Sequence, residues 1–181
     1  MRIISGIYKG RKLKSSKDLS IRPTTDRVKE YIFNILQDFP RETEVFDFFA
    51  GSGSLGLEAL SRGATKASFI EKSATSIKIL KDNLTEIKVP TESYQIVQKD
   101  ALTFTESSQR KADLCFMDPP FIYPPLQDLV NSFFKNQMLN TSGILVVEHE
   151  VINPIELESD LYHIFNQKKI SRSIISFIED R

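Results

Sequence analysis

Strand-like and helix-like segments alternate along the chain from Glu44 onward, and this alternation limits the possible folds more than any other feature. Strands are predicted near residues 45–49, 67–71, 94–98, 113–117 and 143–149, and helices near 54–62, 74–86 and 124–137. Such alternation is typical of an α/β fold, in which a parallel sheet carries helices on both faces. Two final strand-like runs, 162–165 and 173–178, are separated by a link that is only long enough for an antiparallel hairpin. We therefore expect a mostly parallel sheet whose last strand is reversed.

Charge is distributed unevenly along the 181 residues, although the net charge is zero. Residues 1–41 hold ten Lys and Arg against four Asp and Glu, so the remaining residues hold 14 against 20. A basic segment of this kind is either a solvated face or an arm that docks on phosphates, and we favour nucleic-acid binding. We therefore divide the chain into a basic extension, residues 1–41, and a core domain, residues 42–181.

The basic extension has a structure of its own in the sequence pattern. Apolar and glycine positions between residues 2–5 and residues 11–14 predict a short hairpin. Thr24 or Thr25 can then cap a helix whose apolar residues recur at helical spacing until Pro40.

The composition is that of an ordinary globular domain, with 40% hydrophobic and 27% charged residues. No apolar run approaches the roughly 20 residues of a transmembrane helix, and the N-terminus lacks the hydrophobic region of a signal peptide. The single cysteine, Cys115, lies in an apolar run and is expected to be a packing residue. We predict a cytoplasmic protein without an intrachain disulfide, membrane segment or metal.

A glycine-rich turn follows the first predicted strand of the core domain. Gly51, Gly53 and Gly56 fit the spacing of a dinucleotide-binding turn, with Glu71 at the distance of a ribose-binding acid, so a nicotinamide oxidoreductase is an alternative. Asp47, in the strand before the turn, would repel a pyrophosphate but could hold a cationic ligand. This favours S-adenosylmethionine, which has no phosphate and carries an ammonium and a sulfonium.

Two further acidic residues stand where predicted strands end. Glu71 closes the second strand and could accept hydrogen bonds from both ribose hydroxyls. Asp100 and Ala101 follow the third strand, where a carboxylate and a backbone N–H could bind the adenine amino group and a ring nitrogen.

The motif Asp118-Pro119-Pro120-Phe121 follows the buried run 114–117 and is suited to handling an exocyclic amine. The lone pair of a nucleobase amine is delocalised into the ring, so the amine is a weak nucleophile. Asp118 and the carbonyl of Pro119 can each accept one of its N–H groups, and the prolines keep the acceptors aimed. Phe121 offers an apolar face on which a base can stack.

The chain closely resembles the bacterial guanine-N2 methyltransferases of small-subunit (16S) ribosomal RNA, the RsmD type. The resemblance covers Arg2 to about His149 and is carried by residues 2–6 with 9–13, 22–27 with Glu30 and 33–36, 49–63, and 118–121. It implies the class I methyltransferase fold, which is Rossmann-like with a seven-stranded sheet, and S-adenosylmethionine as cofactor. It also implies ribosomal RNA as the partner, within an assembling small subunit or free, and we expect a monomer.

The resemblance also implies roles for individual residues. Asp118, Pro119, Pro120 and Phe121 would hold the target base. The cofactor would be held by Asp47, Phe49, Ala50, Gly51, Ser52, Gly53, Glu71, Lys72, Asp100 and Ala101, and residues 22–27 would border the site. From the charge of the basic extension we expect RNA contacts by Lys9, Arg11, Lys12 and Lys14, together with Arg22 and Arg27. The hairpin link Lys169–Arg172 departs from the family pattern, which has Tyr-Gly in this region. An adenine-N6 methyltransferase and a noncatalytic RNA-binding protein remain alternatives.

Overall fold

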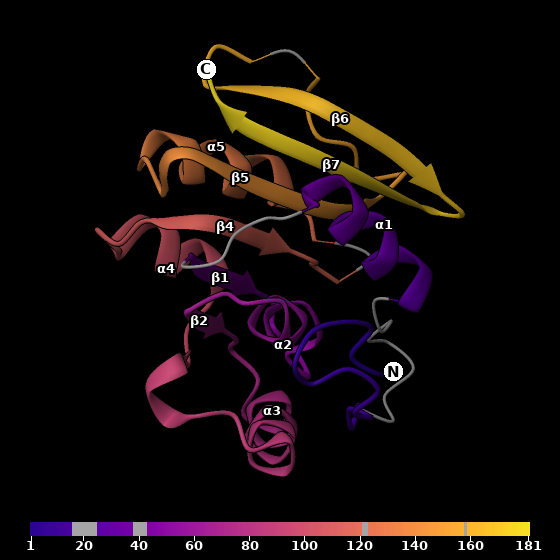
Figure 1. The fold of residues 1–181 in the computed structure, drawn as a ribbon. Coiled ribbons are helices and arrows are strands. Elements are labelled where there is room, and N and C mark those ends of the chain that lie inside the picture. Colours follow the sequence, from indigo (N-terminus) through magenta and orange to yellow (C-terminus); the bar gives the residue numbers. More distant parts are fainter. Residues whose placement is uncertain (16–24, 38–42, 121–122, 158) are drawn as a thin grey trace.

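The computed structural model describes residues 1–15, 25–37, 43–120, 123–157 and 159–181. Its centre is a seven-stranded sheet with the order β3-β2-β1-β4-β5-β7-β6 (Figure 1). The strands are β1 (Glu44–Phe48), β2 (Lys66–Ile70), β3 (Tyr94–Val97), β4 (Ala112–Met117), β5 (Leu139–Glu150), β6 (Tyr162–Ile170) and β7 (Ser173–Asp180). The helices are α1 (Asp26–Leu36), α2 (Ser54–Ser61), α3 (Ala74–Ile87), α4 (Ala101–Ser107) and α5 (Leu126–Lys135), with a 3-10 turn at Thr91–Ser93.

The strand directions confirm the predicted fold class. Strands β3, β2, β1, β4 and β5 are parallel neighbours, whereas β7 pairs antiparallel with both β5 and β6. The chain runs outward from β1 through β2 to β3 and then returns to β4, on the other side of β1. Ligands of open α/β sheets bind at such a reversal, beyond the carboxyl ends of the strands. The site is therefore expected where β1 and β4 end.

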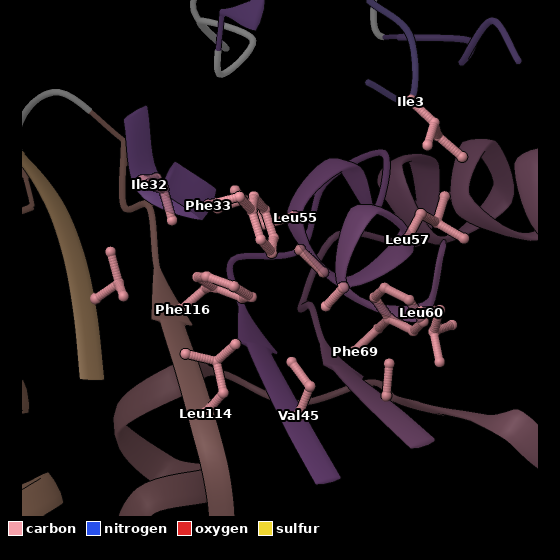
Figure 2. Close-up of a cluster of buried hydrophobic side chains, with 14 of the residues drawn as sticks. Ile3, Ile32, Phe33, Val45, Leu55, Leu57, Leu60, Phe69, Leu114 and Phe116 are labelled. Carbon is pink, nitrogen blue, oxygen red and sulfur yellow. The ribbon is translucent and has the colours of Figure 1, made fainter. Parts of the chain in front are cut away.

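Two hydrophobic clusters cover the two faces of the sheet, because side chains alternate along each strand. On one face, residues of α1, α2 and α3 pack against Val45, Phe69 and Phe116 (Figure 2). On the other face, residues of α4 and α5 pack against Phe46 and Met117. Cys115 is fully buried on the second face, which agrees with its predicted packing role.

The N-terminal segment, residues 1–15, belongs to the first of these clusters through Ile3 and Leu13. It forms the predicted hairpin in reduced form, with one antiparallel bridge between Arg2 and Lys12 in place of two strands. Its backbone closes through hydrogen bonds such as Ile3 N–H to the Arg11 carbonyl, 2.9 Å. In Figure 1 the segment lies beside α2, so it packs against the core domain.

Helix α1 begins where the sequence predicted, since the Thr25 side chain accepts a hydrogen bond from Val28 N–H. It ends at Leu36, and the expected extension to Pro40 lies outside the described residues. Helix α4 was not predicted, because its seven residues place only three buried side chains against the sheet. No helix in the described ranges is long and apolar enough to cross a membrane.

Candidate active site

A cavity of about 220 Å³ lies at the carboxyl ends of the parallel strands. Residues from five strand ends surround it. They are Phe49 and Gly51 after β1, Ile70 to Ser73 at and after β2, Lys99 and Ala101 after β3, Asp118 to Pro120 after β4, and Glu148 to Glu150 at the end of β5. Ser76 of α3 and Ser173 of β7 complete the lining. The cavity therefore joins the predicted cofactor turn to the predicted target motif.

The glycine turn between β1 and α2 needs its glycines for different reasons. Gly53 has φ +83°, and a Cβ there would lie 2.4 Å from Leu80 Cδ1. A Cβ on Gly56 would lie 2.4 Å from Phe69 Cε1, so close packing of α2 on the sheet requires this glycine. Gly51 has φ +55° and lines the cavity, and a Cβ there would meet only the Phe49 carbonyl oxygen, at 3.7 Å. A ligand can thus approach the backbone closely at Gly51.

Glu71 holds this turn in place. Its Oε2 accepts a hydrogen bond from Gly51 N–H at 2.9 Å, and its Oε1 accepts one from Ser73 N–H at 2.8 Å. A carboxylate has about four acceptor positions, so both oxygens can also accept hydrogen bonds from hydroxyls in the cavity. The geometry suits the predicted contact with a ribose.

Asp47 lies behind the turn and does not line the cavity. It is 2% exposed, and its Oδ2 accepts a hydrogen bond from Gly56 N–H at 2.9 Å. Burial raises the pKa of Asp47 to about 8, against the lowering effect of the Gly56 hydrogen bond, and the negative charge of Glu71 adds to the rise. The structure thus gives Asp47 a supporting role for the start of α2, and direct contact with a cofactor stays a prediction.

At the end of β3, Asp100 supports the backbone, as Asp47 does, while its neighbours line the cavity. Asp100 caps α4, because its Oδ1 accepts a hydrogen bond from Leu102 N–H at 3.0 Å, and its Oδ2 lies 3.3 Å from Lys72 Nζ. Lys72, Lys99 and Ala101 line the cavity, whereas Asp100 does not. Ala50, Ser52 and Gly53 likewise belong to the glycine turn without lining the cavity.

The target motif reaches the cavity through Asp118, Pro119 and Pro120. Phe121 lies outside the described residues. Beyond it, the Tyr123 ring meets Phe49 edge-on, with centroids 5.0 Å apart. The Tyr123 carbonyl accepts a hydrogen bond from Asn153 Nδ2 at 3.0 Å, and burial raises the pKa of Tyr123 to about 12. These interactions fix the chain after the motif to the β1 turn and to the end of β5.

Glu148, His149, Glu150 and Ser173 were missed by the sequence interpretation. The signal was present, because Glu148 and Glu150 close a buried strand as Glu71 and Asp100 do. His149 Nδ1 lies 3.2 Å from the Glu150 carbonyl and 3.1 Å from the Asn153 carbonyl, so Nδ1 carries the proton. Burial lowers the pKa of His149, which leaves it a neutral residue that fixes this end of β5.

The predicted RNA-binding residues fall into three groups. Lys9, Arg11 and Lys12 are exposed on the N-terminal segment and form no ion pair with a described residue. Lys14 instead lies 3.1 Å from Glu86 of α3, and this carboxylate raises its pKa. Arg27 is exposed on α1, and Arg22 lies outside the described residues.

Buried charges hold the N-terminal segment in place. Glu58 of α2 is fully buried and accepts hydrogen bonds from the backbone N–H groups of Ile4, at 2.7 Å, and Ser5, at 3.0 Å. It also lies 3.7 Å from Lys29 Nζ, and Lys29 donates a hydrogen bond to the Arg2 carbonyl. The exposed basic side chains are thus carried on a firmly attached loop.

Comparison with known proteins identifies the family. The family model described as conserved hypothetical protein 95 matches residues 1–179. The Haemophilus influenzae protein named ribosomal RNA small subunit methyltransferase D is 38% identical over 157 residues, which cover 86% of this chain and 81% of that protein. The chain belongs to the RsmD family.

Solved structures show the same fold. The Escherichia coli protein yhhF superposes with a TM-score of 0.88 at 32% identity, covering 100% of this chain and 98% of that one. SMU.776, solved in complex with SAH, has a TM-score of 0.72 at 11% identity, covering 88% and 50% of the two chains. The fold is therefore that of the S-adenosylmethionine-dependent methyltransferases.

Proposed function

We propose that the chain is an S-adenosylmethionine-dependent methyltransferase that modifies the exocyclic N2 amine of a guanine in small-subunit ribosomal RNA. One observation carries this proposal: a single cavity is lined both by Gly51 and Glu71, on the predicted cofactor side, and by Asp118, Pro119 and Pro120. The names of the relatives support ribosomal RNA as the substrate. A nicotinamide oxidoreductase would have no task for residues 118–120, which disfavours that alternative.

The residues present fit the cofactor. Gly51 leaves its backbone open to the cavity, and Glu71 offers acceptors for hydroxyl donors beside it. Ala101, at the start of α4, lines the same cavity as Lys72 and Ser73. When bound, S-adenosylmethionine supplies an electrophilic methyl group on a sulfonium.

The chain's own contribution to catalysis is mainly positioning. Asp118 and the Pro119 carbonyl accept the two N–H groups of the target amine, which holds the nitrogen at attack distance and favours localisation of its lone pair. The prolines stiffen the turn that carries both acceptors. After methylation the nitrogen is cationic and loses a proton readily, so Asp118 has only to receive that proton and pass it to solvent.

A methyl-transfer assay tests the proposal. It combines purified protein, methyl-labelled S-adenosylmethionine and small ribosomal subunits from cells lacking this gene. Nucleoside chromatography after complete digestion should show label in N2-methylguanosine. Asp118→Ala, which removes the acceptor, should lose most of this label, whereas the exposed Asp128→Ala on α5 should retain it. Label in N6-methyladenosine would favour the adenine alternative, and no label in RNA would contradict the proposal.

A further inference from the structure

The wall of the cavity opposite the cofactor turn is formed by β5. Strands β4 and β5 are parallel, and their register places Met117 opposite Val147. Asp118 directly follows Met117, where β4 ends, and Glu148 directly follows Val147 within β5, so these two positions come next to each other at this edge of the sheet. Both residues line the cavity, and Glu148 is 7% exposed.

The order of the strands separates the tasks along the sheet edge. From β2 to β5, the cavity residues follow in the order Glu71, Gly51, Asp118 and Glu148. A cofactor held over β1 and β2 therefore meets the amine at β4 from one side. The rest of a base whose amine lies at β4 can extend toward β5, where Glu148 lines the cavity beside the position of the amine.

The acceptor character of this wall extends to Glu150, which lies two residues further along β5 and on the same side of the strand. Its Oε1 is buried and has no hydrogen-bond partner within the described part of the chain, and Glu150 also lines the cavity. A buried acceptor without a donor is unfavourable, so this wall suits a ligand that brings N–H groups.

Nucleobases differ in the ring atom beside their exocyclic amine. In guanine the N2 amine is flanked by N1–H, a donor, on one side and by N3, which has a lone pair, on the other. In adenine and cytosine the amine has a ring nitrogen with a lone pair on one side and a carbon on the other, so neither base has a ring N–H beside its amine. An ionised carboxylate only accepts hydrogen bonds. It would bind guanine N1–H and would face an unfavourable lone pair in the other two bases.

We propose that Glu148 is the residue that selects guanine, by accepting a hydrogen bond from N1–H while Asp118 and the Pro119 carbonyl hold the N2 amine. This inference rests on the proposed function and makes it more specific. It explains how a motif that recognises only an amine can exclude adenine, which carries its amine beside an acceptor.

Synthetic RNAs that carry either guanine or 2-aminopurine at the modified position test this role. The analogue keeps the N2 amine but has a lone pair at N1 and lacks the O6 oxygen. Wild-type protein should prefer guanine by about 10- to 100-fold in kcat/KM, the range of one hydrogen bond to a charged group. Glu148→Gln should reduce this preference to about threefold or less, because the amide can donate to N1 as well as accept from it. The missing O6 affects wild type and variant alike, so the ratio of the two preferences isolates residue 148.

Two controls keep the test decisive. Glu179→Gln makes the same change on an exposed position of β7 outside the cavity, and it should keep the wild-type preference. If Glu148→Gln turns over too slowly to measure, the binding of the two RNAs in the presence of S-adenosylhomocysteine gives the same ratio without chemistry. Thermal unfolding confirms that each variant is folded.

The outcomes separate this inference from the proposed function. A Glu148→Gln protein that prefers guanine over 2-aminopurine as strongly as wild type would overturn the inference and leave guanine methylation intact. A wild-type protein without preference between the two RNAs would also overturn it. A wild-type protein that methylates no guanine would instead overturn the proposed function.

Discussion

The two sides of the cavity satisfy their polar groups in different ways. On the side of β1, β2 and β3, Glu71 accepts hydrogen bonds from two backbone N–H groups, and Asp100, which lies behind the lining, accepts one and pairs with Lys72. On the β5 side, the buried Oε1 of Glu150 has no partner among the described residues. The first side is held in shape by its own hydrogen bonds before any ligand binds, whereas the second side keeps acceptor capacity for a ligand. We infer that the cofactor side is preformed and that the β5 side is completed by the substrate.

The largest effect should come from the point where the two sides meet. Asp118→Ala removes one acceptor for the target amine, so turnover should fall by about 100-fold or more. The variant leaves the contact between Gly51 and Glu71 unchanged. Calorimetry should show nearly unchanged affinity for S-adenosylhomocysteine. Near wild-type turnover would mean that Asp118 to Pro120 form only a structural turn.

On the preformed side, a single charge removal should weaken ligand binding. In Glu71→Gln one carboxylate oxygen is replaced by an NH₂ group, which cannot accept a hydrogen bond. Either Gly51 N–H or Ser73 N–H therefore loses its acceptor. Affinity for S-adenosylhomocysteine should fall by about tenfold or more, since a hydrogen bond to a charged group is removed.

Calorimetry against Glu92→Gln, an exposed position outside the cavity, provides the matched control for Glu71→Gln. Equal affinity of the Glu71→Gln and wild-type proteins would show that this side does not depend on its internal hydrogen bonds.

The contribution of the basic residues to RNA binding should depend on whether each residue is already paired. Replacing Lys9, Arg11 and Lys12 by Ala should weaken RNA binding at every sequence and lower the log-log salt slope by about 0.7 for each phosphate of single-stranded RNA that the variant no longer binds. Lys14→Ala should change the slope less, because Lys14 already pairs with Glu86. A triple variant with wild-type affinity and salt slope would make this loop a solvated face.

The support behind the turn is tested by stability and not by activity. The folded-state pKa of Asp47 is about 8, above the ordinary 3.8, so the folded protein binds more protons than the unfolded chain between these values. Asp47 therefore destabilises the fold progressively as pH rises from about 4 to about 8. Asp47→Asn has no such titration and should gain stability relative to wild type across this range, as measured by denaturant unfolding at several pH values. A difference that does not vary with pH would contradict the raised pKa.

The sequence predicted features that lie close together in the chain and missed features that depend on distant pairing. The glycine turn and residues 118–120 are contiguous motifs, and the structure brings both to the cavity. Glu148 becomes a neighbour of Asp118 only through the β4–β5 register, which no local pattern encodes. Asp47 and Asp100 were assigned ligand contacts, which stay predictions, and the structure adds a role that the sequence did not show: their carboxylates bind Gly56 N–H and cap α4. An acid at a strand end can thus serve the backbone of the next helix as readily as a ligand.

We propose that this one cavity brings S-adenosylmethionine to the amine of a guanine in small-subunit ribosomal RNA. Mass mapping of that RNA from cells with and without the gene tests it most directly. We expect one N2-methylguanine that is present with the gene, absent without it, and restored by the wild-type gene but not by the Asp118→Ala gene. An unchanged set of modified guanines in cells lacking the gene would contradict it.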